Sequence, residues 1–420
     1  MQLLKKALII AIFSIPINCP ARKAFVIVPV ADLVGEPIKT FGLATTNKES
    51  YEKIALCGGP NASSIGAPRI HQLLFNETVE ILHDEPAAEG DEEEVCITFD
   101  GAFFITASIH KPQHIFWTRK KNLLSFEKIA QKNIPLDYIP PIPSFKKPKD
   151  EITAPVIGLI KPFYDPVTHQ TFSVGTRFVY NPTQTTESQY AAYVFDRTIS
   201  SFKVSMVPKS SVQVIQPKAH KEAIICFLSL LRSWIAGNGI IPYVWGGCSY
   251  TTKCPSEDFT LVKKQLKKRK KIYVYNREQC KKSPHTGFDC SGIILRAAQL
   301  CGIPYFFKNT YTLAHYLKSL GIDDHLHEGD LIWIPGHVMI ISDLKDNKLI
   351  EARGYSHDFG HVQEIELEKI FKGIKTYKQL VQAYYLRQPL LRLNKAGNVI
   401  ETIQNFKILK LESVWNHNSY

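Results

Sequence analysis

The chain has 420 residues, of which 45% are hydrophobic and 21% charged, so wholesale disorder is excluded and two or three domains have room to fold. Its formal net charge of +12 favours polyanionic surroundings such as nucleic acid, anionic lipid or an acidic wall polymer, or serves solubility alone. After the N-terminus, no stretch of sequence is apolar for long enough to span a membrane.

Residues 1–24 predict a signal peptide, with cleavage between Cys19 and Ala24. Two lysines precede the apolar run Ala7–Ile17, which is broken at Pro16 and is too short to cross a bilayer comfortably. A lipidated Cys19, a hydrophobic first strand and a membrane anchor are the alternatives. We therefore expect an exported protein, located in the periplasm, in the cell envelope or outside the cell.

Two β-rich units follow the signal peptide. Within residues 25–133, short strand-like runs are separated by turn residues, and residues 134–155 are proline-rich and charged, as in a stiff connector. The acidic run Glu89–Glu94 is expected to be a solvated hairpin loop. A second set of strands with close turns, within residues 156–218, is typical of a small barrel.

A third unit, residues 219–390, alternates helix and strand. Apolar residues at helical spacing and runs bounded by turn residues predict helices over Glu222–Gly237, Cys290–Gly302 and Asn309–Gly321, and strands over Gly329–Gly336, His337–Asp343 and Lys348–Gly354. Residues 391–420 are expected to be a C-terminal tail.

The basic run Lys263–Lys282 interrupts the third unit. We expect a solvated helix face or loop, with a grip on an anionic polymer as the alternative. Basic and aromatic residues do not interleave in a stacking pattern, so nucleic-acid binding is not expected.

Nine cysteines in an exported chain are compatible with disulfides, whose pairing the sequence leaves open. Cys248, Cys254 and Cys280 fall in one segment and could pair locally. The sequence has no CxxC pair and no histidine at zinc-ligand spacing, so a metal site is not expected.

Cys290 stands where the predicted helix 290–302 begins. A helix N-terminus favours negative charge, so this position predicts a lowered thiol pKa, and the backbone N–H groups of the first turn could hold an oxyanion. His337, at the start of its strand, could take the thiol proton, and Glu351 on the next strand could orient the imidazole. Each residue alone is more often structural; their order along the chain favours a catalytic set.

The segment from about Lys221 to Arg387 resembles the NlpC family of cell-wall cysteine peptidases. The matching text is PYVWGG, GFDCSG, EGDLIWIPG, and HVMIISD followed by KLIEARG. The two upstream units are similar to the bacterial SH3-like domains that often precede such a peptidase. The resemblance implies an α+β protein in which a papain-like catalytic domain follows two small all-β SH3-like barrels.

The resemblance also implies an activity: hydrolysis of the γ-D-glutamyl bond to a diamino acid in peptidoglycan stem peptides, with no metal or cofactor. By motif position Cys290 would be the nucleophile and His337 the base. The substrate subsite would be lined by Tyr243, Asp289 and Ser291.

The chain departs from the family pattern at the third catalytic position. A histidine is common there, and this chain has Glu351, with His357 and His361 close by in sequence as further candidates. A carboxylate can orient imidazole as well as another histidine can. The long insertion before GFDCSG is a second departure, and it leaves the substrate's length open. A thiol amidase or acyltransferase acting on another substrate, and a catalytically silent wall-binding protein, are the alternative functions.

Overall fold

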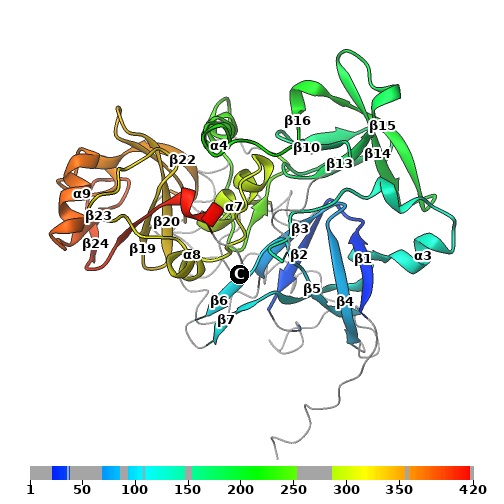
Figure 1. Cartoon of the computed structure of the whole chain (residues 1–420), viewed down its shortest axis with the longest axis horizontal. Coiled ribbons are helices and arrows are strands. Elements are labelled where there is room, and N and C mark those ends of the chain that lie inside the picture. Colours follow the sequence, from blue (N-terminus) through cyan, green and yellow to red (C-terminus); the bar gives the residue numbers. More distant parts are fainter. Residues whose placement is uncertain are drawn as a thin grey trace, which may run out of the picture.

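The computed structural model describes residues 21–35, 37, 69–85, 93–106, 109–146, 154–252, 286–354 and 359–416. It is a mixed α+β protein, rich in sheet and with few helices in this part of the chain (Figure 1). The features predicted outside these residues are most of the signal peptide, the acidic loop up to residue 92, the centre of the connector, the basic run and His357. Among the described helices, none has the length and apolar character needed to cross a bilayer.

The first unit is a seven-stranded antiparallel sheet with the strand order β3-β2-β8-β5-β4-β1-β9. Its strands are β1 (Arg22–Val26), β2 (Val30–Val34), β3 (Arg69–Leu74), β4 (Thr78–Glu85), β5 (Glu94–Thr98), β8 (Ile115–Arg119) and β9 (Leu123–Ser125). A hairpin of β6 (Phe104–Thr106) and β7 (Ile109–Gln113), and the short helix α3 (Phe126–Ala130), complete it. The boundary predicted at residue 24 falls inside β1, which pairs with β4 on one side and β9 on the other.

The second unit is a five-stranded sheet with the order β15-β14-β13-β10-β16 and a separate hairpin of β11 and β12. The strands are β10 (Val156–Leu159), β11 (Phe163–Asp165), β12 (Gln170–Phe172), β13 (Arg177–Asn181), β14 (Gln189–Asp196), β15 (Ser201–Pro208) and β16 (Val212–Val214). The sequence runs predicted as strands in this unit are confirmed.

The third unit places helices against a five-stranded antiparallel sheet of order β22-β21-β20-β19-β25. The helices are α4 (His220–Ile235), α7 (Cys290–Leu300), α8 (Thr310–Tyr316) and α9 (Tyr377–Tyr385). The sheet strands are β19 (Leu331–Ile334), β20 (His337–Asp343), β21 (Lys348–Arg353), β22 (His361–Glu366) and β25 (Lys407–Leu409), and two small pairs are β17 (Cys248–Ser249) with β18 (Gly287–Phe288) and β23 (Leu390–Leu393) with β24 (Val399–Ile403). The three predicted helices and three predicted strands of this unit are present, but α8 ends at Tyr316, five residues before the predicted limit Gly321.

The C-terminal segment lies within the third unit. β25 extends the sheet beside β19, with Leu331 opposite Leu409, and Leu409 and Leu411 are buried in the core. The sequence analysis treated residues 391–420 as a tail outside this unit, and the structure corrects this for the described residues up to 416. β25 obtains its backbone hydrogen bonds by pairing with the edge of β19, and the local sequence pattern does not reveal this pairing.

The central strand β20 is buried on both faces. Val338 and Ile340 belong to the main core with α4 and α7, whereas Met339 and Ile341 pack into a second core under α9. Successive side chains of a strand point to opposite faces, which explains why an unbroken apolar run such as HVMIISD forms a central strand here.

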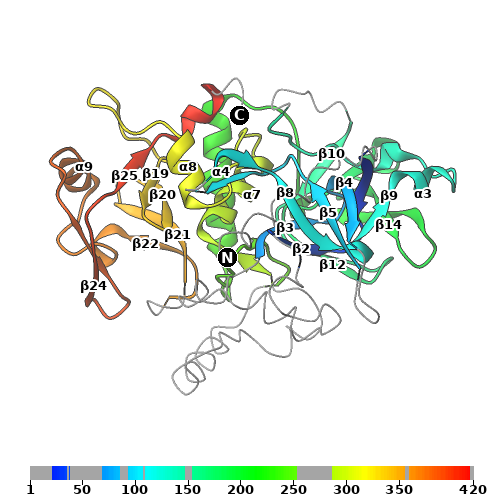
Figure 2. The same ribbon diagram turned by 90° about the horizontal axis from the view of Figure 1, so that it is seen from below.

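Helix α7 lies at the centre of the molecule, between the sheet of the third unit and the two upstream units (Figures 1 and 2). All eleven of its residues are buried, including the polar Arg296 and Gln299. Both are satisfied by the upstream units: Arg296 forms an ion pair with Glu77 (2.6 Å), and Gln299 donates to the Gly101 carbonyl (2.6 Å). The helix that carries Cys290 is therefore fixed from both sides.

Candidate active site

Asp289 is the N-cap of α7, and it positions the cysteine that follows. Its Oδ1 accepts hydrogen bonds from the backbone N–H groups of Ser291 (3.0 Å) and Gly292 (2.5 Å), as a helix N-cap does. Gly292 leaves room for the Gly247 carbonyl, which a Cβ at position 292 would overlap. Cys290 is consequently the first helical residue, at the site that the sequence analysis assigned to it.

Burial governs the ionisation of the Cys290 thiol. It raises the pKa of Cys290, the charge of Asp289 raises it further, and the pKa reaches about 12. Backbone N–H groups of Val338 and Ser291 donate towards the sulfur and act in the opposite direction, as does the charge of Lys308. The predicted lowering of the thiol pKa was therefore wrong in sign for the free protein, because the helix start lies in the core and desolvation of a thiolate outweighs the backbone donors.

His337 and Glu351 form a buried pair, with 2.8 Å between Nε2 and Oε2. Burial lowers the pKa of His337 although the bond to Glu351 opposes this shift. Burial would raise the pKa of Glu351, but the His337 bond and the charges of Arg353 and Arg392 lower it to about 2. At neutral pH the pair is thus a neutral imidazole donating its Nε2–H to a carboxylate.

This arrangement fixes the imidazole tautomer. A carboxylate only accepts hydrogen bonds, so the proton resides on Nε2 and Nδ1 keeps its lone pair. The second carboxylate oxygen of Glu351, Oε1, accepts from the Gln363 amide at 3.0 Å. His337 is therefore oriented as a base with one free nitrogen, which is the arrangement expected of a histidine that takes a thiol proton.

The thiol and the imidazole meet at the start of β20. Cys290 and Val338, the residue directly after His337, are buried in the same core cluster, and the backbone N–H of Val338 lowers the pKa of the Cys290 thiol. Within the described residues no hydrogen bond joins the sulfur to the His337 ring itself. Catalytic hydrogen bonds are often long in structures without substrate and tighten on binding, so this geometry is compatible with the predicted pair.

Of the other two candidates for the third catalytic position, the structure describes His361. His361 donates its Nδ1–H to the Phe359 carbonyl (2.8 Å), and its backbone stands opposite Arg353. His357 lies outside the described residues. Of the two candidates that the structure describes, Glu351 is the residue bonded to His337.

The three predicted substrate-binding residues have different surroundings. Tyr243 is half-buried, and burial together with the charges of Cys290 and Asp289 raises its pKa. Asp289 and Ser291 are buried and bond each other through the Ser291 hydroxyl (2.9 Å). The Ser291 hydroxyl oxygen also accepts a hydrogen bond from the Asn309 N–H (3.3 Å). Most polar side-chain atoms of Asp289 and Ser291 are therefore already bonded within the protein.

Lys308 is a site residue that the sequence analysis did not single out. Its side chain is 2% exposed, and its Nζ lies 2.5 Å from Asp289 Oδ2. One feature of the sequence could have indicated this residue. Lys308 directly follows the aromatic run Tyr305–Phe307, whose side chains are buried, so its charge has to be paired within the core or extend to solvent.

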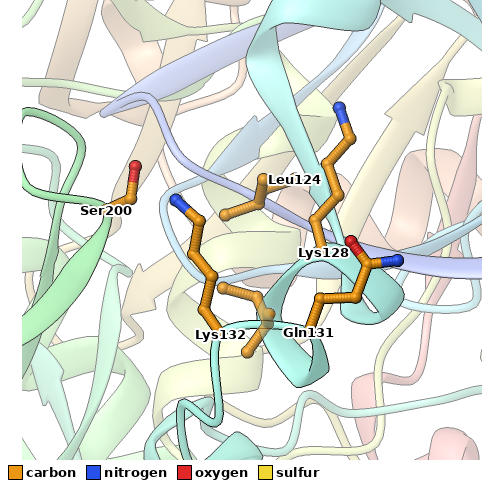
Figure 3. Close-up of a pocket in the computed structure, with 6 residues that line it drawn as sticks. Leu124, Lys128, Gln131, Lys132 and Ser200 are labelled. Atoms are coloured by element: carbon orange, nitrogen blue, oxygen red, sulfur yellow. The ribbon is translucent and has the colours of Figure 1, made fainter.

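A cavity of about 270 Å³ lies between α3 and the turn after β14, away from Cys290 (Figure 3). Its lining carries two ammonium groups, one from α3 and one from the turn that follows it, and is formed by Leu124, Lys128, Ile129, Gln131, Lys132 and Ser200. No residue of the candidate active site contributes to it.

The described cysteines Cys96, Cys226, Cys248, Cys290 and Cys301 are free thiols, and the remaining ones lie outside the described residues. Within the same part of the chain, no group of three or more His, Cys, Asp or Glu side chains is placed to hold a metal ion.

This chain shows limited similarity to known proteins. No family model and no curated protein matches the chain. Among solved structures, the peptidoglycan hydrolase RipB from Mycobacterium tuberculosis is similar at 20% sequence identity with a TM-score of 0.22, over 35% of this chain and 59% of that one. The chain thus matches less than two thirds of that protein, and a TM-score of this size carries no argument about function. The assignment depends on the site and on the sequence motifs.

Proposed function

We propose that the protein is a cysteine endopeptidase of the NlpC type that cleaves the γ-D-glutamyl–diamino acid bond of peptidoglycan stem peptides. One observation carries the proposal: Cys290, the first residue of a buried helix, is packed in one core with the residue directly after His337, whose ring is bonded to Glu351 at 2.8 Å. The motifs around these residues are those of the NlpC family.

The chemistry follows from the ionisation of the resting site. The pKa of Cys290 is raised by burial and that of His337 is lowered by burial, so thiol and imidazole are both neutral before substrate binds. The thiol proton passes to His337 Nδ1 as sulfur attacks the amide carbonyl. Glu351, already ionised, then stabilises the imidazolium through Nε2.

The start of α7 would stabilise the oxyanion in this scheme. When sulfur bonds the carbonyl carbon, negative charge develops on the carbonyl oxygen of the substrate, and the N-terminal end of α7, which favours negative charge, would stabilise it. The backbone N–H groups of Ser291 and Gly292 already donate to Asp289 Oδ1, so the start of the helix would act mainly through its dipole. His337 next protonates the leaving amine of the diamino acid, and water attacks the thioester to release the γ-D-glutamyl product and the free thiol.

The proposal also states where the protein acts and which polymer it meets there. An exported protein with a formal charge of +12 would meet an anionic cell wall in the periplasm, the envelope or outside the cell. The two β-rich units, proposed to be SH3-like, supply none of the three residues of the scheme and contact α7 through Arg296 and Gln299, so they would orient the catalytic unit on the wall.

The test is incubation of the purified protein with L-Ala-γ-D-Glu-diamino acid peptides, one with diaminopimelate and one with lysine, followed by mass spectrometry. We expect cleavage after D-Glu by the parent and none by Cys290→Ala. Cys96→Ala is the matched control, because Cys96 is a buried thiol on β5 of the first β-rich unit and has no role in the scheme.

The remaining outcomes separate the alternatives. Release of a different acyl group from intact peptidoglycan, dependent on Cys290, would indicate a thiol amidase or acyltransferase. Sedimentation with insoluble peptidoglycan by both the parent and Cys290→Ala, with no product from either, would identify a wall-binding protein and contradict the peptidase proposal.

A further inference from the structure

A buried ion pair stands directly beside the candidate nucleophile, and the proposed reaction does not use it. Lys308 Nζ lies 2.5 Å from Asp289 Oδ2, and the two side chains are 2% and 11% exposed. The other carboxylate oxygen of Asp289 is occupied by the first turn of α7. The carboxylate thus connects the lysine to the residue before Cys290.

The position of Lys308 is set from outside α7. Its backbone N–H donates to the Phe103 carbonyl (2.8 Å), and the Phe103 N–H donates to the Phe306 carbonyl (2.9 Å). The next residue, Asn309, has a φ of +72° and donates through its backbone N–H to Ser291. The first β-rich unit therefore helps to hold the ammonium group at the start of the helix.

Burying an ammonium group is costly unless it is paired, so a lysine here needs the carboxylate. The carboxylate of Asp289 likewise needs the lysine. An unpaired Asp289 would place a full negative charge one residue before the sulfur, in a buried region where Coulomb interactions are screened weakly.

We propose that Lys308 is a positioning residue for the thiol chemistry of Cys290, neutralising Asp289 so that the N-cap carboxylate does not oppose thiolate formation at the next residue. The inference deepens the proposed function and rests on it for its biological meaning. The charges act in the required directions: Asp289 raises the pKa of Cys290, and Lys308 lowers it.

A second thiol lies beside the same lysine. Cys248 is fully buried, and burial raises its pKa although the charge of Lys308 opposes this shift, so it stays a neutral thiol. Asp289 is then the anion that Lys308 pairs with, and the lysine remains charged, since the attraction of Asp289 contributes to raising its pKa against the effect of burial.

A purely structural ion pair would give a different result from an electrostatic one. If Lys308 only tethers the segment before α8 to α7, its removal lowers stability and leaves the reactivity of the Cys290 thiol in the folded protein unchanged. If it neutralises Asp289, the thiolate fraction changes with the net charge of the pair, in opposite directions for the two single substitutions.

The experiment measures the alkylation rate of Cys290 by iodoacetamide between pH 7 and 9 in the full chain, with peptide mass spectrometry to separate the thiols. Below the thiol pKa the rate follows the thiolate fraction. We expect Lys308→Met to slow alkylation at pH 8 by about 10- to 100-fold and Asp289→Asn to speed it by about 10-fold, as one to two pKa units of charge interaction imply. The double variant should return to within about threefold of the parent, because the net charge of the pair is again zero.

Internal controls are available. Cys226 on α4 is half-buried and distant from the pair, so its alkylation rate reports any general change in accessibility. Asparagine is as good an N-cap as aspartate, so Asp289→Asn keeps the helix start and provides the test if Lys308→Met does not fold. Folded variants with the parent's Cys290 rate, or equal rates for both single variants, would overturn the inference.

Failure of the inference and failure of the proposed function remain distinguishable. Cleavage of the stem peptide with no charge-dependent change in alkylation overturns the role of Lys308 and leaves the peptidase in place. The expected series of alkylation rates with no cleavage of any stem peptide supports the charge control of Cys290 and contradicts the peptidase.

Discussion

His337 Nε2 and Glu351 Oε2 are 2.8 Å apart in a site where both side chains are almost completely buried. This contact joins the first residue of β20 to the middle of β21, fourteen residues later in the chain. It determines which imidazole nitrogen carries the proton and leaves Nδ1 free to act as a base. The bond is therefore the structural basis for assigning the third catalytic position to Glu351.

Replacing Glu351 with glutamine should invert the imidazole tautomer. Gln363 donates to Oε1 of residue 351, so a glutamine there keeps its oxygen towards Gln363 and turns its NH₂ towards His337. The ring then accepts at Nε2 and carries its proton on Nδ1, where a base is needed. We expect kcat/KM for the stem peptide to fall by about 10²- to 10⁴-fold with little loss of stability.

The control for this substitution is Glu364→Gln, on the same sheet. Glu364 bonds Arg232 at 3.2 Å and does not touch His337. A Glu351→Gln variant that turns over as fast as Glu364→Gln would show that the carboxylate does not set the tautomer.

Adding a methyl group at Gly292 should displace the nucleophile. A Cβ there would overlap the Gly247 carbonyl oxygen, which is backbone and cannot rotate away, so the first turn of α7 has to shift. A displacement of about 1 Å at a catalytic group can cost about 10²-fold in rate. We expect that loss in kcat/KM for Gly292→Ala, measured on the stem peptide.

Gly237→Ala provides the comparison. That glycine has no atom within 4 Å of a built Cβ, and its φ of +84° makes alanine strained by about 1–2 kcal/mol. It should lower stability and leave turnover unchanged. Equal turnover by both variants would mean that the close approach of Gly247 does not position Cys290.

Removing the charge of Arg296 should separate α7 from the first β-rich unit. Its guanidinium is 3% exposed, pairs with Glu77 at 2.6 Å and donates to the carbonyls of Gln72 (3.2 Å) and Cys248 (3.1 Å). Breaking a buried pair by removing one partner costs about 3–5 kcal/mol. We expect Arg296→Met to lower the urea midpoint accordingly, as followed by circular dichroism.

An exposed pair offers the matched control. Lys369 and Glu366 are 2.7 Å apart on the surface with side chains 61% and 42% exposed. Lys369→Met should leave the urea midpoint essentially unchanged, because exposed ion pairs contribute little. If Arg296→Met behaves in the same way, the ion pair on α7 does not hold the units together.

Stability should fall as the pH drops below about 6.5, the pKa of an unperturbed histidine. Burial lowers the pKa of His71, His337 and His361 in the folded protein. The unfolded chain therefore takes up protons first, and the free energy of unfolding decreases as the pH falls from about 6.5 towards the folded pKa values. Glu351, with a pKa of about 2, begins to lose its contribution only below about pH 4.5.

The measurement is the urea midpoint at pH 7.5, 6.0 and 5.0 at constant ionic strength. His71→Phe should flatten the dependence, because His71 is stacked on Phe99 with ring centroids 5.5 Å apart and an aromatic replacement fills the same space without titrating. A midpoint that is constant from pH 7.5 to 5.0 would contradict the assignment of these histidines as neutral in the folded state.

Local patterns were sufficient to predict the elements that carry the site. The apolar spacing of Cys290–Leu300 and the apolar run of His337–Asp343 specify a buried helix and a central strand, because the periods of helix and strand are visible within a few residues. The order of cysteine, histidine and acid along the chain also named Glu351 before its bond to His337 was seen.

The sequence by itself thus predicted the α+β class and a candidate set of Cys290, His337 and Glu351, with His357 and His361 as alternatives to the acid. The tertiary structure decided the ionisation of that set, since the pKa of Cys290 depends on burial and on charges brought in by folding. It also decided the partners of α7, because Lys308 is 19 residues from Asp289 and Glu77 is 219 residues from Arg296. Such pairs are created by chain folding over long separations, and no local periodicity encodes them.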